Sequence, residues 1–243
     1  MYLNLTKKRK AIAMIELIFA IVVLGIVMLS APMVISSATK SGYVALQQES
    51  IAAASSEIGM ILTYHWDENN TDENLSSPIL VTTAGDTNLN ESMDAGGNPA
   101  RVRAGSTIES KRSFLTSTNE RLNASSTLGS DGDSDDIDDF IGTSTLTNIE
   151  TTTTSTGDYI DSAIQLTTAI DYVSDAPTTG NYLNSDLSIT FDYNASSVAG
   201  TTNIKGITLT LTTTNTQSEI AKSIQLRAFA CNIGTYELAQ RNY

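Results

Sequence analysis

The sequence predicts an α+β protein in which a long N-terminal α-helix packs on a C-terminal antiparallel β-sheet. Two observations lead to this fold class: an apolar run from Ala11 to Ile35, and three segments of alternating apolar residues near the C-terminus. A long apolar run favours a helix, whereas period-two alternation favours strands with one buried face. A chain of 243 residues has room for one ordinary domain and an extended element.

The apolar run at the N-terminus is long enough to cross a membrane as a helix. Its sequence, AIAMIELIFAIVVLGIVMLSAPMVI, contains one charged residue, Glu16. A helix rises about 1.5 Å per residue, so about 20 residues cross the roughly 30 Å of hydrocarbon in a bilayer. Basic residues from Lys7 to Lys10 precede the run, which predicts a cytoplasmic N-terminus and a periplasmic or external remainder.

Two ordinary explanations account for only part of this run. A cleaved secretory signal has a shorter apolar core followed by small residues at the cleavage site, and the run lacks both features. A plain signal anchor fits the length and the flanking charges, but it gives no role to Glu16. An ionised side chain within a membrane costs about 2.5–3.5 kcal/mol on insertion scales, so Glu16 calls for a partner.

The segment KKRKAIAMIELIFAIVVLGIV resembles the N-terminus of type IV pilins and pseudopilins, with a basic leader, a small residue at the cut and a glutamate fifth in the mature chain. The resemblance implies that a prepilin peptidase removes the leader peptide, residues 1–11, by cutting after Ala11. Ile12 then becomes the N-methylated first residue, and Glu16 matches the family's glutamate. The family usually has glycine before the cut and phenylalanine after it, so Ala11 and Ile12 depart from its pattern.

The resemblance also implies an assembly salt bridge for Glu16. Cleavage frees the amine of Ile12, and a neighbouring subunit shifted along a filament can present that amine to the Glu16 carboxylate. Removing one partner from a buried pair of charges costs about 3–5 kcal/mol, so the pair selects one axial offset between subunits. Residues 12–35 are therefore interpreted as a transmembrane and assembly helix.

The helix is expected to continue into the head over residues 36–66, with Trp66 packing its end against the head. Apolar residues recur there at spacings of three, four or seven, namely Val44, Ile51, Ile58, Ile61 and Leu62. Such a stripe predicts an amphipathic helix that covers a sheet, and this is the lollipop shape that pilins share. Gly25 and Pro32 predict a helix kink or local melting near residues 25–32, although membrane helices also tolerate both residues.

Residues 67–156 form a variable polar region, in which we expect loops and a few short strands. Its sharpest feature is the acidic loop 130–140, SDGDSDDIDDF. The alternation of Asp131, Asp133 and Asp135, with Asp139 as a fourth ligand, is typical of an oxygen-rich calcium site. The loop lacks the central glycine and the final glutamate of an EF-hand. The alternatives are an irregular Ca²⁺ site and a solvated acidic loop, and Ca²⁺ is the one cofactor that the sequence suggests.

Residues 157–243 are predicted to form the C-terminal antiparallel β-sheet. Apolar and polar residues alternate at 187–193, at 207–211 and at 224–228. This pattern predicts three strands with one wet face and one apolar face that receives the helix. Residues 159–173 add either a further strand or a short helix, and their sequence does not decide between the two.

Composition argues against several classes of function. The net charge is −13, which disfavours direct nucleic-acid binding apart from a local basic cluster of Arg101, Arg103, Lys111 and Arg112. Cys231 is the only cysteine and His65 the only histidine, so an intramolecular disulfide and a zinc site of several imidazoles are excluded. The sequence shows no Ser/His/Asp set and no phosphate-binding loop, so we do not expect an enzyme.

The sequence therefore favours a structural subunit of a type IV pilus or of a type II secretion-like pseudopilus. By the resemblance, its partners are homologous pilin or pseudopilin subunits in a helical filament, the prepilin peptidase and an inner-membrane assembly platform. The subunit would lie in the inner membrane with a periplasmic head, and after assembly in a periplasmic pseudopilus or a surface pilus. Cell adhesion, secretion and DNA uptake stay open as roles. The alternative is a membrane-anchored adhesin that does not polymerise, which gains nothing from Glu16.

Overall fold

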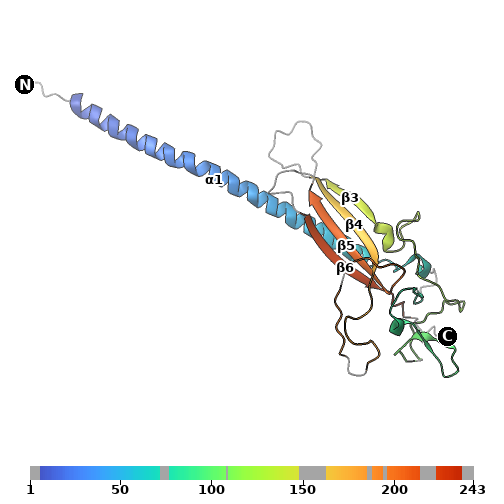
Figure 1. The fold of residues 1–243 in the computed structure, drawn as a ribbon. Helices are drawn as coiled ribbons and strands as arrows, with labels where there is room; N and C mark the ends of the chain where they lie inside the picture. The colour runs from blue at the N-terminus through green and yellow to red at the C-terminus, as the bar shows by residue number, and fades with distance from the viewer. Residues whose placement is uncertain are drawn as a thin grey trace, which may run out of the picture. The chain divides into compact units, whose positions relative to one another are not determined.

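The computed structural model describes residues 6–71, 77–107, 109–147, 163–184, 188–193, 196–213 and 223–236 (Figure 1). The chain divides into two compact units, residues 1–50 and 51–243, which we treat separately. The helix α1 (Thr6–Ile61) begins in the first unit and ends in the second. The second unit, called the head below, contains a four-stranded and a two-stranded sheet. A long N-terminal helix and a C-terminal antiparallel sheet confirm the predicted α+β class.

The described part of the N-terminal unit, residues 6–50, is a single unbroken helix. Residues 25–32 are helical throughout, although Pro32 lies inside α1. A β-carbon built on Gly25 would have no neighbour within 4 Å, so packing within the chain does not require glycine there. The described chain therefore shows no local melting at Gly25 and Pro32, and a kink or loosening when subunits pack stays a prediction.

The end of α1 differs from the prediction, since the helix ends at Ile61 and not at residue 66. The Thr63 hydroxyl and its N–H both donate to the carbonyl of Met60, which closes a tighter turn. His65 then pairs its backbone with the acidic loop: its N–H donates to Asp135 O, and its carbonyl accepts from the N–H of Ile137 at 3.0 Å. Backbone groups that a helix would use are thus bonded to a distant segment, and the helix cannot continue.

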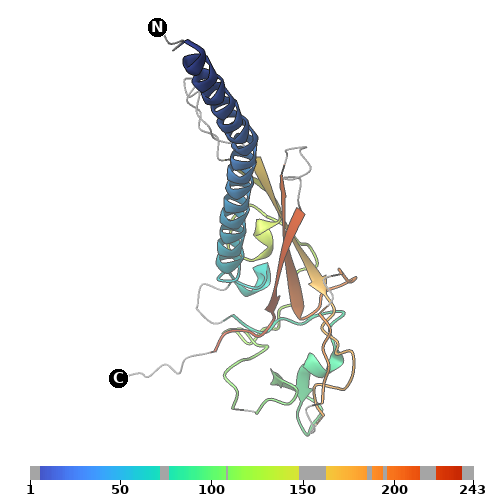
Figure 2. The same cartoon turned by 90° about the vertical axis from the view of Figure 1, so that its left-hand side faces the viewer.

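The head is built on an antiparallel sheet with the strand order β3-β4-β5-β6 (Figures 1 and 2). Its strands are β3 (Gly142–Thr147), β4 (Ala163–Val173), β5 (Ile204–Thr213) and β6 (Ser223–Cys231). The predicted strands at 207–211 and 224–228 are confirmed as parts of β5 and β6. The ambiguous segment 159–173 contributes a strand, β4, which pairs along its whole length with β5.

The predicted strand at 187–193 is wrong for its described residues, 188–193. Within them only Thr190 forms a bridge, to Thr179, and Ile189 and Phe191 are 40% and 37% exposed. The place beside β4 is taken instead by β3, whose sequence GTSTLT carries little apolar signal. Alternation alone does not make a strand, because a strand also needs a partner with free backbone groups.

The sheet has one buried and one exposed face, as predicted. Along β4, Leu166, Thr168 and Ile170 are buried, whereas Thr167 and Ala169 between them are exposed. The cross-strand partners of Leu166 and Ile170 in β5 are Leu211 and Ile207, which are also buried. These pairs place one apolar layer on one face of the sheet. Figure 2 shows the last turns of α1 beside one face of the sheet.

The apolar stripe predicted for residues 36–66 is only partly correct. Within the head, Ala54 and Ile61 are fully buried, whereas Ile51 and Leu62 are 38% and 44% exposed. The helix thus buries a narrow face that includes Ala54, a small residue outside the predicted stripe. Trp66, just past the helix, is buried as predicted.

The rest of the head holds short elements, as expected for residues 67–156. The second sheet pairs β1 (Glu91–Met93) with β2 (Pro99–Arg103), and three single-turn helices lie at Glu68–Asn70, Thr87–Leu89 and Asp138–Phe140. Arg103 leaves the predicted basic cluster, because its side chain turns inward and donates to Asn203 Oδ1 at 3.0 Å and to the carbonyl of Asn232 at 2.9 Å.

Candidate functional site

A buried lysine forms the electrostatic centre of the head. Lys205 in β5 has the same parity as Ile207, Leu209 and Leu211, so its side chain points to the apolar face of the sheet. It is 0% exposed. Its Nζ lies 3.1 Å from Asp67 Oδ2 and is in direct contact with Asp138 Oδ1. Lys205 therefore joins the segment after α1 to the acidic loop.

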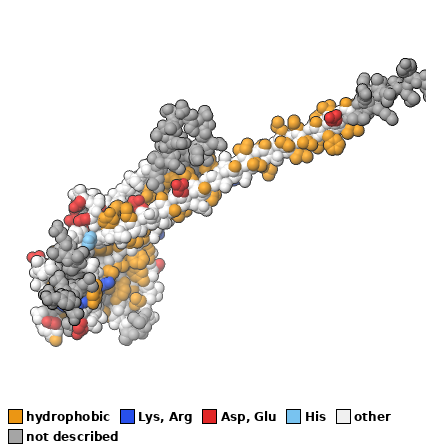
Figure 3. Space-filling view, turned by 180° about the vertical axis from the view of Figure 1, so that it is seen from behind, with side chains coloured by type: hydrophobic (Ala, Val, Ile, Leu, Met, Phe, Trp, Pro, Cys, Tyr) orange, Lys and Arg blue, Asp and Glu red, His pale blue; other side chains and the backbone are white. Residues whose placement is uncertain are grey.

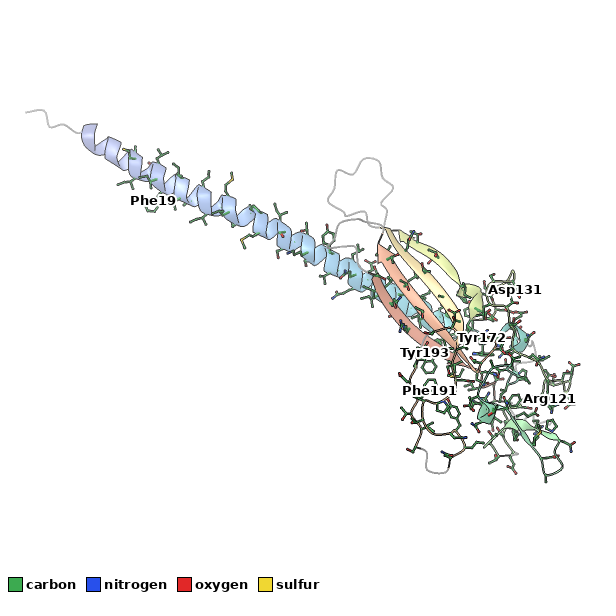
Figure 4. All side chains as sticks on the ribbon, in the orientation of Figure 1. Phe19, Arg121, Asp131, Tyr172, Phe191 and Tyr193 are labelled. Atoms are coloured by element: carbon green, nitrogen blue, oxygen red, sulfur yellow. The ribbon has the colours of Figure 1, made fainter. Side chains whose placement is uncertain are left out.

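Asp67 is the more fully bonded of the two carboxylates. It is 0% exposed and accepts from the N–H of Asn69 at 3.2 Å and the N–H of Ser125 at 3.1 Å. The hydroxyl of Tyr172, labelled in Figure 4, donates to the same carboxylate at 3.0 Å. Burial, followed by the charge of Asp67, raises the pKa of Tyr172, so its hydroxyl stays a donor at neutral pH.

Asp138 is positioned by the turn that contains it. Its Oδ2 accepts from the N–H of Gly129 at 3.1 Å, and its own N–H donates to Asp136 Oδ1 at 2.8 Å. Asp136 is also buried, and burial together with the charge of Asp138 raises its pKa to about 7. Two buried carboxylates, Asp67 and Asp138, thus contact one buried ammonium, and a third buried carboxyl group, Asp136, accepts from the N–H of Asp138; all four residues belong to the head.

Two aromatic rings cover the amine. Lys205 Nζ lies 4.9 Å from the ring centroid of Trp66 and 5.4 Å from that of Tyr172. The indole N–H of Trp66 donates to the carbonyl of Ala230 in β6 at 3.2 Å, which fixes the ring over the sheet. Cation–π contacts of this kind add attraction and exclude water.

The acidic loop does not bring the four predicted calcium ligands together. Asp139 Oδ2 accepts from the N–H groups of Asp135 at 3.0 Å and Asp136 at 3.1 Å, so this carboxylate stabilises the loop itself. Glu68 lies near the other three instead: local desolvation, then the charges of Asp135, Asp131 and Asp133, raises its pKa to about 7. Among the described residues, no group of three acidic, histidine or cysteine side chains has metal-binding geometry.

Calcium binding by this loop stays a prediction, and its effect on stability is expected to grow with pH. Because Glu68 has a higher pKa in the folded chain than its ordinary 4.5, its contribution to stability is complete below about pH 4.5 and is lost as the pH rises through about 7. A bound Ca²⁺ would offset this repulsion, so millimolar calcium should raise the Tm of the detergent-solubilised chain more above pH 7 than near pH 5.

The matched control is the pair Asp133→Ala/Asp135→Ala, in which the calcium-dependent rise should vanish. Glu68→Gln should flatten the pH dependence without calcium, because it removes the titrating group and keeps the shape. A Tm that millimolar calcium leaves unchanged above pH 7 would refute calcium binding.

The residues of the predicted cleavage and assembly site lie in the N-terminal unit. The backbones of Ala11 and Ile12 are within α1, while their side chains lie outside the described ones. Glu16 is exposed, and so are the large apolar residues around it, such as Ile15 at 57% and Phe19 at 68%. Figure 3 shows hydrophobic side chains crowding this part of the helix. Such a surface has no partner within the described chain and calls for lipid or other protein.

Sequence analysis missed Lys205 as a site residue, because the strand was predicted at 207–211 and Lys205 lies two residues before it; in β5 it has the parity of the apolar residues. The partners Asp67 and Asp138 carry no such pattern, since both lie in polar, acidic segments.

The chain has one helix among its described residues that is long and apolar enough to cross a membrane. Comparison of the chain with protein-family models, with curated proteins and with solved structures gave no match.

Proposed function

We propose that the chain is a structural subunit of a type IV filament, a pilus or a pseudopilus, and that it is inserted as a prepilin, cleaved after Ala11 and polymerised through residues 12–35. The observation that carries the proposal is a helix whose large apolar side chains are exposed from Met14 to Ile35, with one carboxylate, Glu16, among them. An apolar surface of this length fits lipid before assembly and neighbouring helices afterwards.

The lone carboxylate favours a filament over a simple anchor. A membrane anchor needs apolar side chains alone, and an acidic residue only weakens its insertion. A filament provides Glu16 with a cation, the freed amine of Ile12 in a neighbouring subunit. The same helix runs on into the head, where Ala54 and Ile61 are fully buried, so each head is carried on a continuous helix.

Mass spectrometry of sheared filaments tests the proposal. We expect the mature chain to begin at Ile12 with one added methyl group, because the peptidase cuts and methylates in succession. The matched variants are Ala11→Gly, which has the residue usual in the family and should be cut, and Ala11→Asp, which places a charge at the cut and should not.

The result that would overturn the proposal is equally direct. Filaments that contain the chain with Met1 or Tyr2 still at its N-terminus would refute processing at Ala11. Absence of the chain from every sheared filament, with the protein abundant and intact in membranes, would instead support the anchored adhesin.

A further inference from the structure

The contact between Lys205 and Asp138 brings a buried amine against a buried carboxyl group. Lys205 is 0% exposed and Asp138 is 4% exposed, so bulk water reaches neither. A second carboxylate, Asp67, lies 3.1 Å from the same Nζ and is 0% exposed. The rings of Trp66 and Tyr172 cover the amine. In this dry site one nucleophile, the amine of Lys205, contacts both an acyl group, Asp138, and a proton acceptor, Asp67.

As an ion pair, this arrangement has an unfavourable free energy of desolvation. Burying ions costs several kcal/mol each, and replacement of a buried ion pair by neutral groups is often neutral or stabilising. Here one ammonium faces both Asp67 and Asp138, and a third carboxyl group, Asp136, is also buried. A reaction that turns one ammonium and one carboxylate into a neutral group removes two of these buried charges.

We propose that Lys205 and Asp138 condense into an intramolecular amide bond. The ammonium of Lys205 gives a proton to Asp67, and the neutral Nζ attacks Cγ of Asp138. A C–N bond forms, one C–O bond breaks, and Asp67 passes the two protons lost by Nζ to the leaving oxygen. One water molecule leaves and Asp67 ends as it began, so no oxidant, reductant or cofactor is needed.

The surrounding residues favour bond formation over hydrolysis. Lys205, Asp67 and Asp138 are all buried, so bulk water does not reach the new amide and its hydrolysis is slow. The reacting groups are held from separate elements: Lys205 by β5, and Asp138 by its bond from the N–H of Gly129 at 3.1 Å. Holding both partners in contact supplies the proximity that an amide condensation lacks in water.

Trypsin digestion of the full chain, followed by mass spectrometry, decides between an amide and an ion pair. Trypsin needs a free lysine amine, and the sequence has no lysine or arginine between Arg121 and Lys205. If the bond forms, cleavage after Lys205 is lost, and one peptide from Leu122 to Lys222 appears, lighter by one water molecule. If it does not form, Leu122–Lys205 and Gly206–Lys222 appear separately at their sequence masses.

Three variants give the test its controls, and the readout works on denatured protein, so the two variants that cannot form the amide do not have to fold. Lys205→Arg keeps the positive charge and a tryptic site but cannot form this amide, and Asp138→Ala removes the acyl group; both should be cleaved after position 205. Asp67→Asn should slow or abolish the loss of water, because the proton carrier is gone. Complete cleavage of the wild-type chain after Lys205, with no loss of water, would overturn the proposal.

Discussion

Glu16→Ala is expected to leave membrane insertion intact and to remove the subunit from filaments. The substitution deletes the only charge in the apolar run, so insertion becomes easier. In a filament it leaves the amine of Ile12 of a neighbouring subunit buried without its partner, which costs about 3–5 kcal/mol. Since about 1.4 kcal/mol is a factor of ten, incorporation should fall at least about 100-fold.

The measurement compares the amount of chain in the membrane fraction with the amount in sheared filaments. Glu16→Gln separates charge from shape, and it should behave like Glu16→Ala if the charge is what matters. Glu49→Ala is the matched control, because Glu49 is an exposed glutamate of the same helix outside the apolar run, and it should assemble normally. Normal incorporation of Glu16→Ala would show that this carboxylate has no part in assembly.

Lys205→Met is expected to destabilise the head by about 3–5 kcal/mol, because Asp67 and Asp138 are then both buried carboxylates, with neither a cation nor the proposed amide to neutralise them. Domains of this kind unfold with about 5–15 kcal/mol, so the loss takes a third or more of the stability in many cases. Urea unfolding of the detergent-solubilised chain, followed by the fluorescence of the single tryptophan, Trp66, measures the change at the site itself.

The double variant Lys205→Met/Asp138→Asn should recover part of this loss, since one orphaned carboxylate is then neutral. Lys111→Met removes an exposed lysine of the same head, and its effect should stay within about 0.5 kcal/mol. If Lys205→Met unfolds at the same urea concentration as the wild-type chain, the buried charges do not determine the stability of the head.

The elements that could be predicted are those whose sequence pattern lies within their own segment. The apolar run predicted α1, and alternation predicted β5 and β6, because the burial of each residue there depends mainly on its parity within its own segment. The same rule failed at 188–193, where Ile189 and Phe191 alternate with polar residues, but the one bridge of the segment joins Thr190 to Thr179, outside the named strands. The rule also failed to predict β3, which is rich in threonine. The hydroxyl of Thr143 in β3 is hydrogen-bonded to the hydroxyl of Thr167 in β4 at 3.2 Å.

The site could be predicted only in part, for a similar reason. Ala11, Ile12 and Glu16 lie within six residues of each other, so their pattern can be recognised in one short segment. The ion cluster in the head combines Asp67, Asp138 and Lys205, which come from three distant parts of the chain. These residues stay together because leaving any one of their charges buried without a partner costs free energy. That cost depends on residues far apart in the sequence, so no short segment predicts it.

Asp67 lies six residues after the end of α1 and is paired with Lys205 at the start of β5, an interior strand of the main sheet. A pulling force applied to the head through the helix therefore acts on the contact between Asp67 and Lys205 before it acts on the hydrogen bonds between strands. Because β5 is flanked on both sides by β4 and β6, the tension is shared among neighbouring strands. Under stretching, the chain should yield first at the loops outside this load path.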